Sequence, residues 1–395
     1  MKSRILLLFL FLWVGMAACK KNTDIAPGEN FTRIYDNGEF GGSFYPIDII
    51  PVANDGGYVI LGERRLDDSN FFGVYILKVD KAGNFEWEFK APSTYVNPLP
   101  GIFVVNNEAH FFCMDRVSLQ TVVMKVGDKN ASVVSTIGRV YPLAVSRTTD
   151  QGFLLQSYDR TTLNTVLTKL SSSFAITWST NHAVLEDAEE LLVNHLTRIG
   201  TRLPFLTGEN GSGGYFFNGF YNYTISMVMT NASGTYTGVL NGFRYNGSVS
   251  SAVNLGSNRY AISRFYFNDN FFVPQATISS SAVASANDLK GQYMTELNPS
   301  ARVMSKRLNV GGKDVIIYAT DTKSNQIVIY AYESQTGTLL GTKFLGYSNP
   351  YEVANFAITE DGGLAVVGTN YINGRFPRIC LFKLAKSELN KLVGS

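Results

Sequence analysis

A turn followed by an apolar strand occurs three times in this chain, at widely separated places. The three copies are NDGGYVILG at 54–62, TDQGFLLQS at 149–157 and EDGGLAVVG at 360–368. Glycine tolerates positive φ and aspartate bonds to its own backbone, so each copy predicts a tight turn that enters a strand. Repetition of this kind indicates a fold that is built from copies of one supersecondary unit.

A second segment follows the turn and returns more often. In the first copy it reads VYILKVDKAGNFEWEF at 74–89, and the other copies align on the position of Lys78. The aligned column holds Lys78, Lys125, Lys169, Met229, Glu296, Ala331 and Lys383. A mean interval of about 51 residues without helical periodicity is typical of a β-propeller, an all-β fold. Seven positions predict seven blades in one domain, 30–395, with loops inserted in the two long intervals that flank Met229.

Each unit is expected to contain four strands. In the first unit these are 46–53, 58–63, 74–80 and 85–89. The last unit has only a weak fourth strand, in LNKLVGS, whereas the segment NFTRIYDNG at 30–38 precedes the first unit as an orphan strand. We therefore predict that residues 31–35 pair with the strand containing 379–384, so that an N-terminal strand closes the last blade and removes an open edge.

The repeat pattern D-G-G-[YF]-x-x-x-G followed by [ILV]-x-K-[VLI]-D-x-x-G-N-x-x-W resembles the repeats of β-propeller surface lipoproteins of Bacteroidetes-type bacteria. The pattern is good in the first unit, moderate in the third and seventh, and weak in the others. The blades of that family are largely of unassigned function. The resemblance therefore implies a fold and an envelope location, and no activity.

The N-terminus has the pattern of an export signal. Lys2 and Arg4 precede an apolar run, and Ala17 and Ala18 stand directly before Cys19. Residues 1–18 therefore read as a secretory signal peptide. The small residues before Cys19 resemble a lipobox, which implies cleavage before Cys19 and its lipidation; ordinary secretion and an uncleaved anchor are the alternatives. Residues 19–29 read as the lipidated cysteine and a flexible tether.

The composition argues against several classes of partner. The chain has 34 Lys and Arg against 32 Asp and Glu, and loss of Lys2 and Arg4 with the signal would leave 32 of each. Nucleic-acid binding requires a basic patch, and the sequence has none. Cys113 and Cys380 lie in apolar strand patterns and are expected to be buried free thiols, with a disulfide as the less favoured alternative. We expect a monomer.

No sequence motif of an enzyme is present, and no cofactor or metal site is expected. The three histidines, His110, His182 and His195, are scattered, and scattered histidines are more often packed or surface residues than ligands. The acidic stretch EDAEELL at 186–192 could supply carboxylates for acid–base chemistry. Such a run is more often a solvated turn or a single helical turn. An enzyme of this fold would be expected to place paired carboxylates or a histidine at the central channel.

Two aromatic segments are the candidate ligand contacts, because aromatic faces beside amides suit a neutral glycan or a peptide surface. The first segment, 208–224, combines a glycine-rich start, 208–214, read as a mobile loop, with the candidates Tyr215, Phe217, Phe220, Tyr221 and Tyr223. The second, 264–274, contains the candidates Tyr266, Asn268 and Asp269. The alternative for the first is that its rings belong to core strands, and for the second that it is a plain hairpin.

These features together predict a lipoprotein that is anchored in the outer membrane through lipid on Cys19. Its propeller is expected to bind or scaffold rather than to catalyse, with a neutral glycan or a protein as partner. A structural role in an outer-membrane complex is the alternative, and a carbohydrate-active propeller enzyme is a less favoured one.

Overall fold

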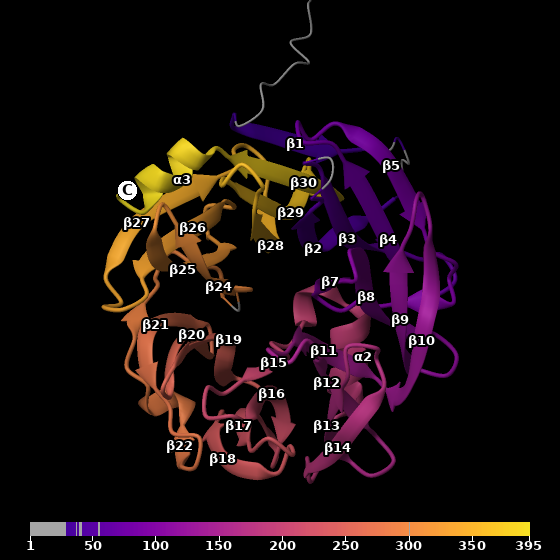
Figure 1. The fold of residues 1–395 in the computed structure, drawn as a ribbon, viewed down its shortest axis with the longest axis vertical. Coiled ribbons are helices and arrows are strands. Elements are labelled where there is room, and N and C mark those ends of the chain that lie inside the picture. The colour runs from indigo at the N-terminus through magenta and orange to yellow at the C-terminus, as the bar shows by residue number, and fades with distance from the viewer. Residues whose placement is uncertain (1–28, 37, 39–41, 54–55, 300) are drawn as a thin grey trace, which may run out of the picture.

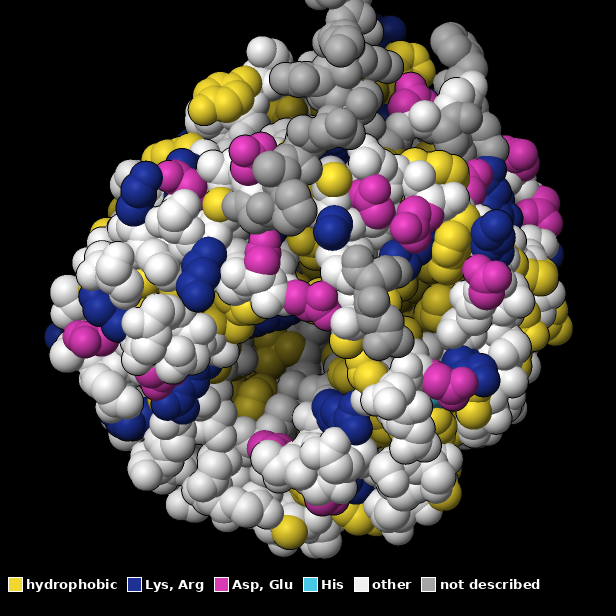
Figure 2. All heavy atoms as spheres, turned by 45° about the horizontal axis from the view of Figure 1, so that its top comes forward, with side chains coloured by type: hydrophobic (Ala, Val, Ile, Leu, Met, Phe, Trp, Pro, Cys, Tyr) yellow, Lys and Arg dark blue, Asp and Glu magenta, His cyan; other side chains and the backbone are white. Residues whose placement is uncertain are grey.

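The computed structural model describes residues 29–36, 38, 42–53, 56–299 and 301–395. In this part of the chain nearly all regular structure is β-strand, and the sheets stand in a ring around a central opening (Figure 1). Figure 2 shows the opening as a hollow, with apolar side chains inside it and charged side chains at its rim. This arrangement is the β-propeller architecture that the repeat predicts. The predicted signal peptide, Cys19 and most of the predicted tether lie outside the described residues.

The first repeat unit forms the four antiparallel strands that the sequence predicts. They are β2 (Phe44–Pro51), β3 (Tyr58–Arg65), β4 (Phe72–Val79) and β5 (Phe85–Lys90). The two-residue strand β6 (Tyr95–Val96) links β4 to the next group of strands, so one sheet contains both groups. That second group consists of β7 (Ile102–Val105), β8 (Glu108–Asp115), β9 (Gln120–Val126) and β10 (Ala131–Val140).

Four more sheets continue the ring, each with its first strand nearest the centre (Figure 1). The third unit contains β11 (Pro142–Arg147), β12 (Phe153–Asp159), β13 (Asn164–Leu170) and β14 (Ile176–Ala183). The fourth contains β15 (Leu206–Glu209), β16 (Tyr215–Tyr221), β17 (Thr224–Thr230) and β18 (Tyr236–Asn241), with β22 (Val283–Ser285) added in parallel. The fifth contains β19 (Gly247–Gly256), β20 (Arg259–Tyr266), β21 (Asp269–Thr277) and β23 (Gln292–Tyr293). The sixth contains β24 (Met304–Val310), β25 (Lys313–Asp321), β26 (Ile327–Glu333) and β27 (Leu339–Leu345).

The last sheet combines the two ends of the chain. It contains β28 (Tyr351–Ile358), β29 (Leu364–Ile372), β30 (Phe376–Leu384) and, as its outer strand, β1 (Phe31–Tyr35). In the antiparallel pairing of β1 with β30, Phe31 stands opposite Lys383 and Tyr35 opposite Ile379. The predicted pairing of 31–35 with 379–384 is confirmed. The weak strand expected in LNKLVGS is instead the helix α3 (Lys386–Leu392).

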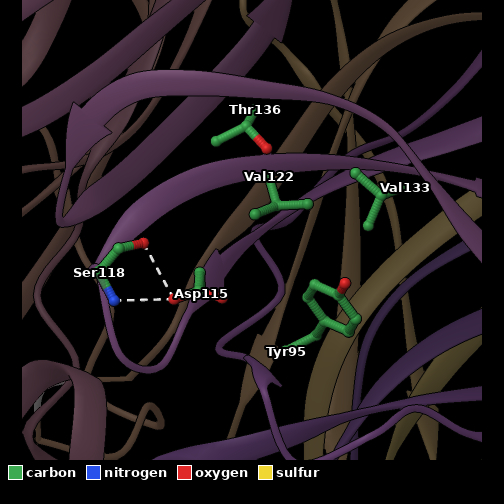
Figure 3. Close-up of a pocket in the computed structure, with 6 residues that line it drawn as sticks. All are labelled: Tyr95, Asp115, Ser118, Val122, Val133 and Thr136. Carbon is green, nitrogen blue, oxygen red and sulfur yellow. Dashed lines mark hydrogen bonds between the residues drawn. The ribbon is translucent and has the colours of Figure 1, made fainter.

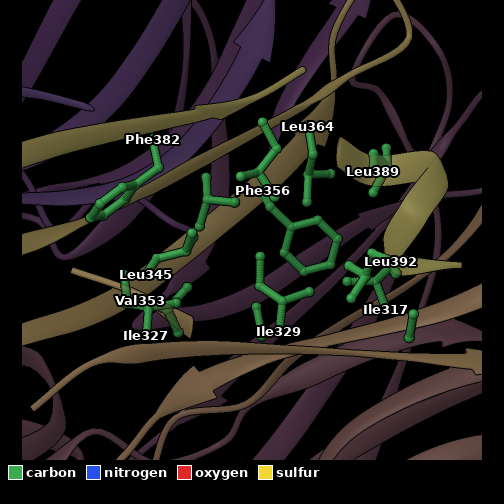
Figure 4. Packing of buried hydrophobic residues seen from close by; sticks show 14 of the residues in the cluster. Ile317, Ile327, Ile329, Leu345, Val353, Phe356, Leu364, Phe382, Leu389 and Leu392 are labelled. Atoms are coloured by element: carbon green, nitrogen blue, oxygen red, sulfur yellow. The ribbon is translucent and has the colours of Figure 1, made fainter. Parts of the chain in front are cut away.

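Apolar side chains between neighbouring sheets form the core. Figure 4 shows the cluster between the sixth and the last sheet, where Ile317 and Ile329 of the sixth sheet face Phe356 of β28. Leu389 and Leu392 of α3 close the outer end of this cluster. Central strands that are buried on both faces explain why their sequences are continuously apolar rather than alternating.

The predicted register is wrong in the fifth unit. The alignment put Glu296 in the third strand, but the third strand is β21 (Asp269–Thr277) and residues 304–310 are already the first strand of the next sheet. The third strand of this unit lacks the lysine and the D-x-x-G-N turn, so the alignment moved to a later segment of similar pattern. The second long interval is therefore largely an alignment error.

The first long interval does contain an insertion, between β14 and β15. It forms the helix α2 (Glu189–Thr197) and the 3-10 turn η1 (Ile199–Thr201). Leu192 and Leu196 of α2 are buried in a cluster with Tyr158 and Phe220, at the ends of the third and fourth sheets. The acidic stretch thus begins a packed helix of more than one turn. Among the described helices, none is long and apolar enough to cross a membrane.

Candidate functional site

The lysines of the repeat column have a structural role. The Nζ atom of Lys169 donates to Asp150 at 2.9 Å and to the carbonyl oxygen of Leu170 at 3.2 Å, so that it joins the turn between the first and second strands to the third strand. Lys383 makes the same ion pair with Asp361. A Cβ atom on Gly152 would lie 2.3 Å from the Lys169 Nζ atom, which explains the glycine at that position. In the third and last units the turn aspartate and the column lysine therefore form an ion pair that joins the turn to the third strand, whereas Lys125 pairs with Glu108 and is 36% exposed.

The glycine-rich part of the first candidate segment, 208–214, forms the turn between the first and second strands of the fourth unit, at the place where other units have the D-G-G turn. In the fourth unit Met229 replaces the lysine, and the Asn210 amide nitrogen donates to the carbonyl oxygen of Thr230 at 2.8 Å instead. The Asn210 side-chain oxygen accepts from the backbone N–H groups of Ser212 and Gly214, both at 3.0 Å. The prediction of a mobile loop at 208–214 is wrong, because these residues form a side-chain-capped hairpin turn between β15 and β16.

The aromatic residues of this segment fall into three classes of exposure. Phe217 and Phe220 lie in β16, which is the second strand of its sheet, and they are fully buried between sheets. They belong to the core, as the alternative interpretation held. Tyr215 and Tyr221 are half-buried on the outer side of the ring, against Trp178 and Tyr236 respectively. Of the five predicted ring contacts in this segment, Tyr223 is the exposed one, with 53% of its surface accessible.

The second candidate segment is a hairpin whose tip carries an aromatic cluster. Tyr266 of β20 pairs with Asp269 of β21, so Phe267 and Asn268 form the two-residue tip. The ring centroids of Tyr266 and Phe267 are 4.8 Å apart in an edge-to-face arrangement, and Phe243 lies 5.9 Å from both rings. We call Phe243, Tyr266 and Phe267 the aromatic rim. Sequence reasoning missed Phe243 and Phe267, although Phe267 stands between two of the predicted residues.

Both exposed tips hold an aromatic side chain on an unfavourable backbone. Phe267 has φ 51° and Tyr223 has φ 64°, in the left-handed region that favours glycine or asparagine. Phe267 is 49% exposed and Phe243 is 45% exposed. The β16–β17 and β20–β21 hairpins both join the second to the third strand of a sheet, so their tips emerge on one face of the ring. Positive φ is not confined to these tips, since the buried Phe174 has φ 66°, so exposure of the rings is what distinguishes the two tips.

Carboxylates do occur at the central channel, and they are engaged. Asp48 accepts from the backbone N–H of Ile49 at 2.8 Å, from that of Ile102 at 2.9 Å and from the Asn355 amide at 2.6 Å. These bonds connect the first strands of three neighbouring units. Asp321 accepts from the backbone N–H of Val353, and burial raises its pKa. Both groups act as links between sheets rather than as a free acid–base pair.

The three histidines are all packed. His110 lies against Phe174, and its Nδ1 atom is 2.9 Å from the carbonyl oxygen of Glu108. His182 is buried against the ring of Phe217, which lowers its pKa to about 4. His195 accepts from the backbone N–H of Leu203 at 2.8 Å, and desolvation lowers its pKa to about 3. None of them lies in a cluster that could hold a metal ion, since the described residues contain no group of three or more His, Cys, Asp or Glu side chains arranged in that way.

A small pocket lies beside β6, with Tyr95 and Val133 on facing walls (Figure 3). Its volume is about 210 Å³, below the roughly 300 Å³ at which ligand pockets begin. Asp115 accepts from the backbone N–H of Ser118 at 2.7 Å and from its hydroxyl at 2.9 Å, and these bonds lower the pKa of the Asp115 carboxyl. Asp115, the one acidic residue among the described residues that line the pocket, is therefore hydrogen-bonded within its own turn.

The two cysteines within the described residues are buried and free, as predicted. Cys113 lies in β8 and Cys380 in β30, in separate sheets, and burial raises the pKa of both thiols. A buried thiol of raised pKa is a poor nucleophile, because the thiolate is the reactive form.

Comparison with known proteins yields a fold likeness and nothing closer. No family model matches the chain, and no curated protein matches it. YCF48 from Cyanidioschyzon merolae is similar in structure with a TM-score of 0.48 and 9% identity, over 90% of this chain and 99% of that one. The β-propeller domain of the Trilobed protease from Pyrococcus furiosus has a TM-score of 0.45 and 8% identity, over 89% of this chain and 98% of that one. At such values the likenesses assign no function to this chain.

Proposed function

We propose that this protein is an outer-membrane lipoprotein whose propeller binds a neutral saccharide through the aromatic rim. The observation that carries the proposal is the hairpin tip at Phe267, where an aromatic side chain is held in solvent at positive φ. Asparagine or glycine would fit that backbone with less strain. Contact with a partner would account for the phenylalanine at this place.

The chemistry of the rim favours a saccharide over a charged ligand. Aromatic faces take up the apolar C–H face of a sugar ring, and the exposed Asn268 amide supplies both a hydrogen-bond donor and an acceptor. Arg244 and Asp269 adjoin the rim residues in sequence with opposite charges, so neither sign dominates there. A protein partner remains the second candidate, because exposed aromatic residues are also enriched in protein interfaces.

We also propose that the ring has seven blades. Support comes from the sheet of nine strands, in which the two-residue β6 joins two groups of four antiparallel strands. If each group counts as one blade, these two and the remaining five sheets make seven. The first and last sheets also share a hydrophobic cluster that contains Ile49, Leu77, Val367 and Leu381, as neighbouring blades do.

The proposed function is tested with Phe267→Asn, a change that removes the ring and suits the backbone. Purified mature protein is screened on a glycan array and in a pull-down from envelope extract, and the affinity for any glycan retained is then measured. We expect Phe267→Asn to weaken binding at least tenfold while its melting temperature stays equal or rises. Phe85→Asn is the matched control, since Phe85 is an exposed aromatic of β5, away from the rim.

The outcomes separate the alternatives. Equal glycan binding by Phe267→Asn and the unchanged protein would contradict the rim as the site. Capture of one protein, lost in Phe267→Asn and without any glycan signal, would favour a structural component of an outer-membrane complex. Conversion of a retained glycan would show a carbohydrate-active enzyme instead. The lipid anchor is tested separately: a fatty-acid analogue should label the protein in cells, and Cys19→Ala should lose the label.

A further inference from the structure

Three charged side chains from distant parts of the chain meet at the central channel. Arg202 lies in the connection that leads into β15, and Arg302 in the connection that leads into β24. Both of these strands are the innermost of their sheets (Figure 1). Glu63 comes from β3 of the first sheet, is 3% exposed, and accepts a hydrogen bond from Arg202.

Arg302 is the unusual member of the three. It is half-buried, and among the described residues no hydrogen bond or ion pair engages its guanidinium. Burial, followed by the nearby charge of Arg202, lowers the pKa of Arg302 to about 10. Guanidinium groups carry five N–H donors, so the donors of Arg302 are open to solvent or to a ligand. Two neighbouring guanidinium groups, one of which has no partner among the described residues, offer the positive charge and the N–H donors that an anion would bind.

The carboxylates nearby do not fill the vacant donors. Glu63 is bonded to Arg202, and even so the Arg202 Nε atom is buried without a hydrogen-bond partner. Asp48 is fully engaged with backbone N–H groups and Asn355, and Asp321 with the backbone N–H of Val353. Burial also raises the pKa values of Glu63 and Asp321, which weakens their negative charge.

Lys306 of β24 stands four residues after Arg302 and carries a further positive charge. Its Nζ atom donates to the carbonyl oxygen of Phe356 at 2.6 Å, and burial lowers its pKa. The positive charge of Lys306 would attract an anion, whereas Arg302 and Arg202 supply the N–H donors that lack partners in the described part of the chain. The planar fork of a guanidinium matches the two oxygens of a carboxylate or a phosphate.

We propose that the channel binds a compact oxyanion, the carboxylate or phosphate group of a small ligand, between Arg302 and Arg202. This site is separate from the aromatic rim and does not depend on the proposed saccharide function. It adds an acidic small molecule, or an acidic group on a larger one, to the partners that the molecule can hold.

Calorimetric titration of the mature protein at low ionic strength tests this site, with inorganic phosphate and glucuronate as probes and glucose as the neutral control. We expect phosphate, glucuronate or both to bind, glucose not to bind, and Arg302→Gln to weaken anion binding at least tenfold. Binding of phosphate alone or of glucuronate alone identifies the source of the oxyanion. Arg375→Gln, a change of an exposed arginine on the β29–β30 hairpin, should bind as the unchanged protein does.

A second variant keeps the test decisive if Arg302→Gln fails to fold. Glu63→Gln removes the carboxylate that competes for Arg202, so it should lower the melting temperature without anion and bind the anion several-fold more tightly. Its melting temperature should then recover on addition of phosphate. The proposal is overturned if neither anion binds at millimolar concentration, or if binding is the same in the unchanged protein, Arg302→Gln and Glu63→Gln.

Discussion

Replacing Phe31 by alanine tests whether β1 holds the ring together. Phe31 is 8% exposed and belongs to the cluster that the first and last sheets share, with Phe44, Tyr58 and Ile60. Truncation of a buried phenylalanine costs about 3–5 kcal/mol. Because Phe31 lies on the outer strand of its sheet, where the cavity can partly collapse, we expect the low end, about 3 kcal/mol.

Urea unfolding followed by tryptophan fluorescence measures this cost. Trp87 lies in β5 and Trp178 in β14, and β14 is on the far side of the ring from β1 (Figure 1). The Trp178 part of the signal therefore reports on the ring away from the mutation, whereas Trp87 lies in the first sheet, whose β4–β5 turn contacts β1. With a slope of about 3 kcal/mol per M urea, the loss should lower the midpoint by about 1 M. Thr32→Ala, an exposed position of the same strand, should shift the midpoint by much less.

The reasoning fails if Phe31→Ala and Thr32→Ala have the same midpoint. A loss of hydrogen-exchange protection confined to β30, without a change at the tryptophans, would mean that β1 is docked locally and does not hold the ring. Truncation gives an independent check. Removal of residues up to 36 should lower the melting temperature of the whole molecule, whereas removal of residues up to 28 should not, since β1 begins at Phe31.

Two further predictions concern buried ionisable side chains. Lys169→Met should lower the free energy of unfolding by about 1–2 kcal/mol, because the lysine side chain is only 6% exposed and its charge-assisted hydrogen bonds are lost. The control is Lys125→Met, which should change the free energy of unfolding by less than about 0.5 kcal/mol because the Lys125 side chain is 36% exposed. The urea midpoints of the two variants measure the difference. The folded-state pKa of His182 is about 4 against about 6.5 unfolded, so its contribution is complete above pH 6.5 and is lost as the pH falls toward 4. Stability at pH 5 should therefore be about 2 kcal/mol lower than at pH 7.5 from this residue, and His182→Gln should remove that part; parallel pH profiles of the two proteins would count against it.

The sequence predicted the architecture well where local chemistry sets the structure. Strands, turns and the pairing of 31–35 could be predicted because continuous apolar runs, glycine and side-chain-capped turns act over a few residues. The register failed in the fifth unit, where hydrogen bonding between β20 and β21 selects the third strand and no lysine marks it. The sequence contained a clue, because FYFNDNFF reads as a hairpin with N-D-N at its turn.

Candidate residues were harder to predict, because exposure depends on the position of a strand within its sheet. Phe217 and Tyr223 are six positions apart in one aromatic run, yet the first is in the core and the second is on a tip. Arg202, Arg302 and Glu63 are scattered in the sequence and carry no motif. Only the closure of the ring brings them to one channel, so no local pattern could have found them.

The direction of β1 relative to the aromatic rim gives a last prediction. Phe31 pairs with Lys383, so the chain enters the ring on the face of the lysine–aspartate turns. The rim emerges on the opposite face, at the hairpins between second and third strands. A lipid on Cys19 would therefore hold the turn face toward the membrane and direct the rim away from it.

Site-directed labelling of vesicle-bound lipoprotein with a bulky maleimide tests that orientation. Cys113 and Cys380 are buried and should not react, so introduced cysteines report alone. Asn268→Cys on the rim face should react several-fold faster than Lys81→Cys in the β4–β5 turn, because the membrane shields the turn face. In detergent without vesicles the two rates should become equal, since both positions are exposed. The tether of about ten residues can extend roughly 35 Å, so the shielding is partial. Equal rates on vesicles would mean that the tether lets the ring turn freely, and a faster Lys81→Cys would mean that the rim faces the membrane.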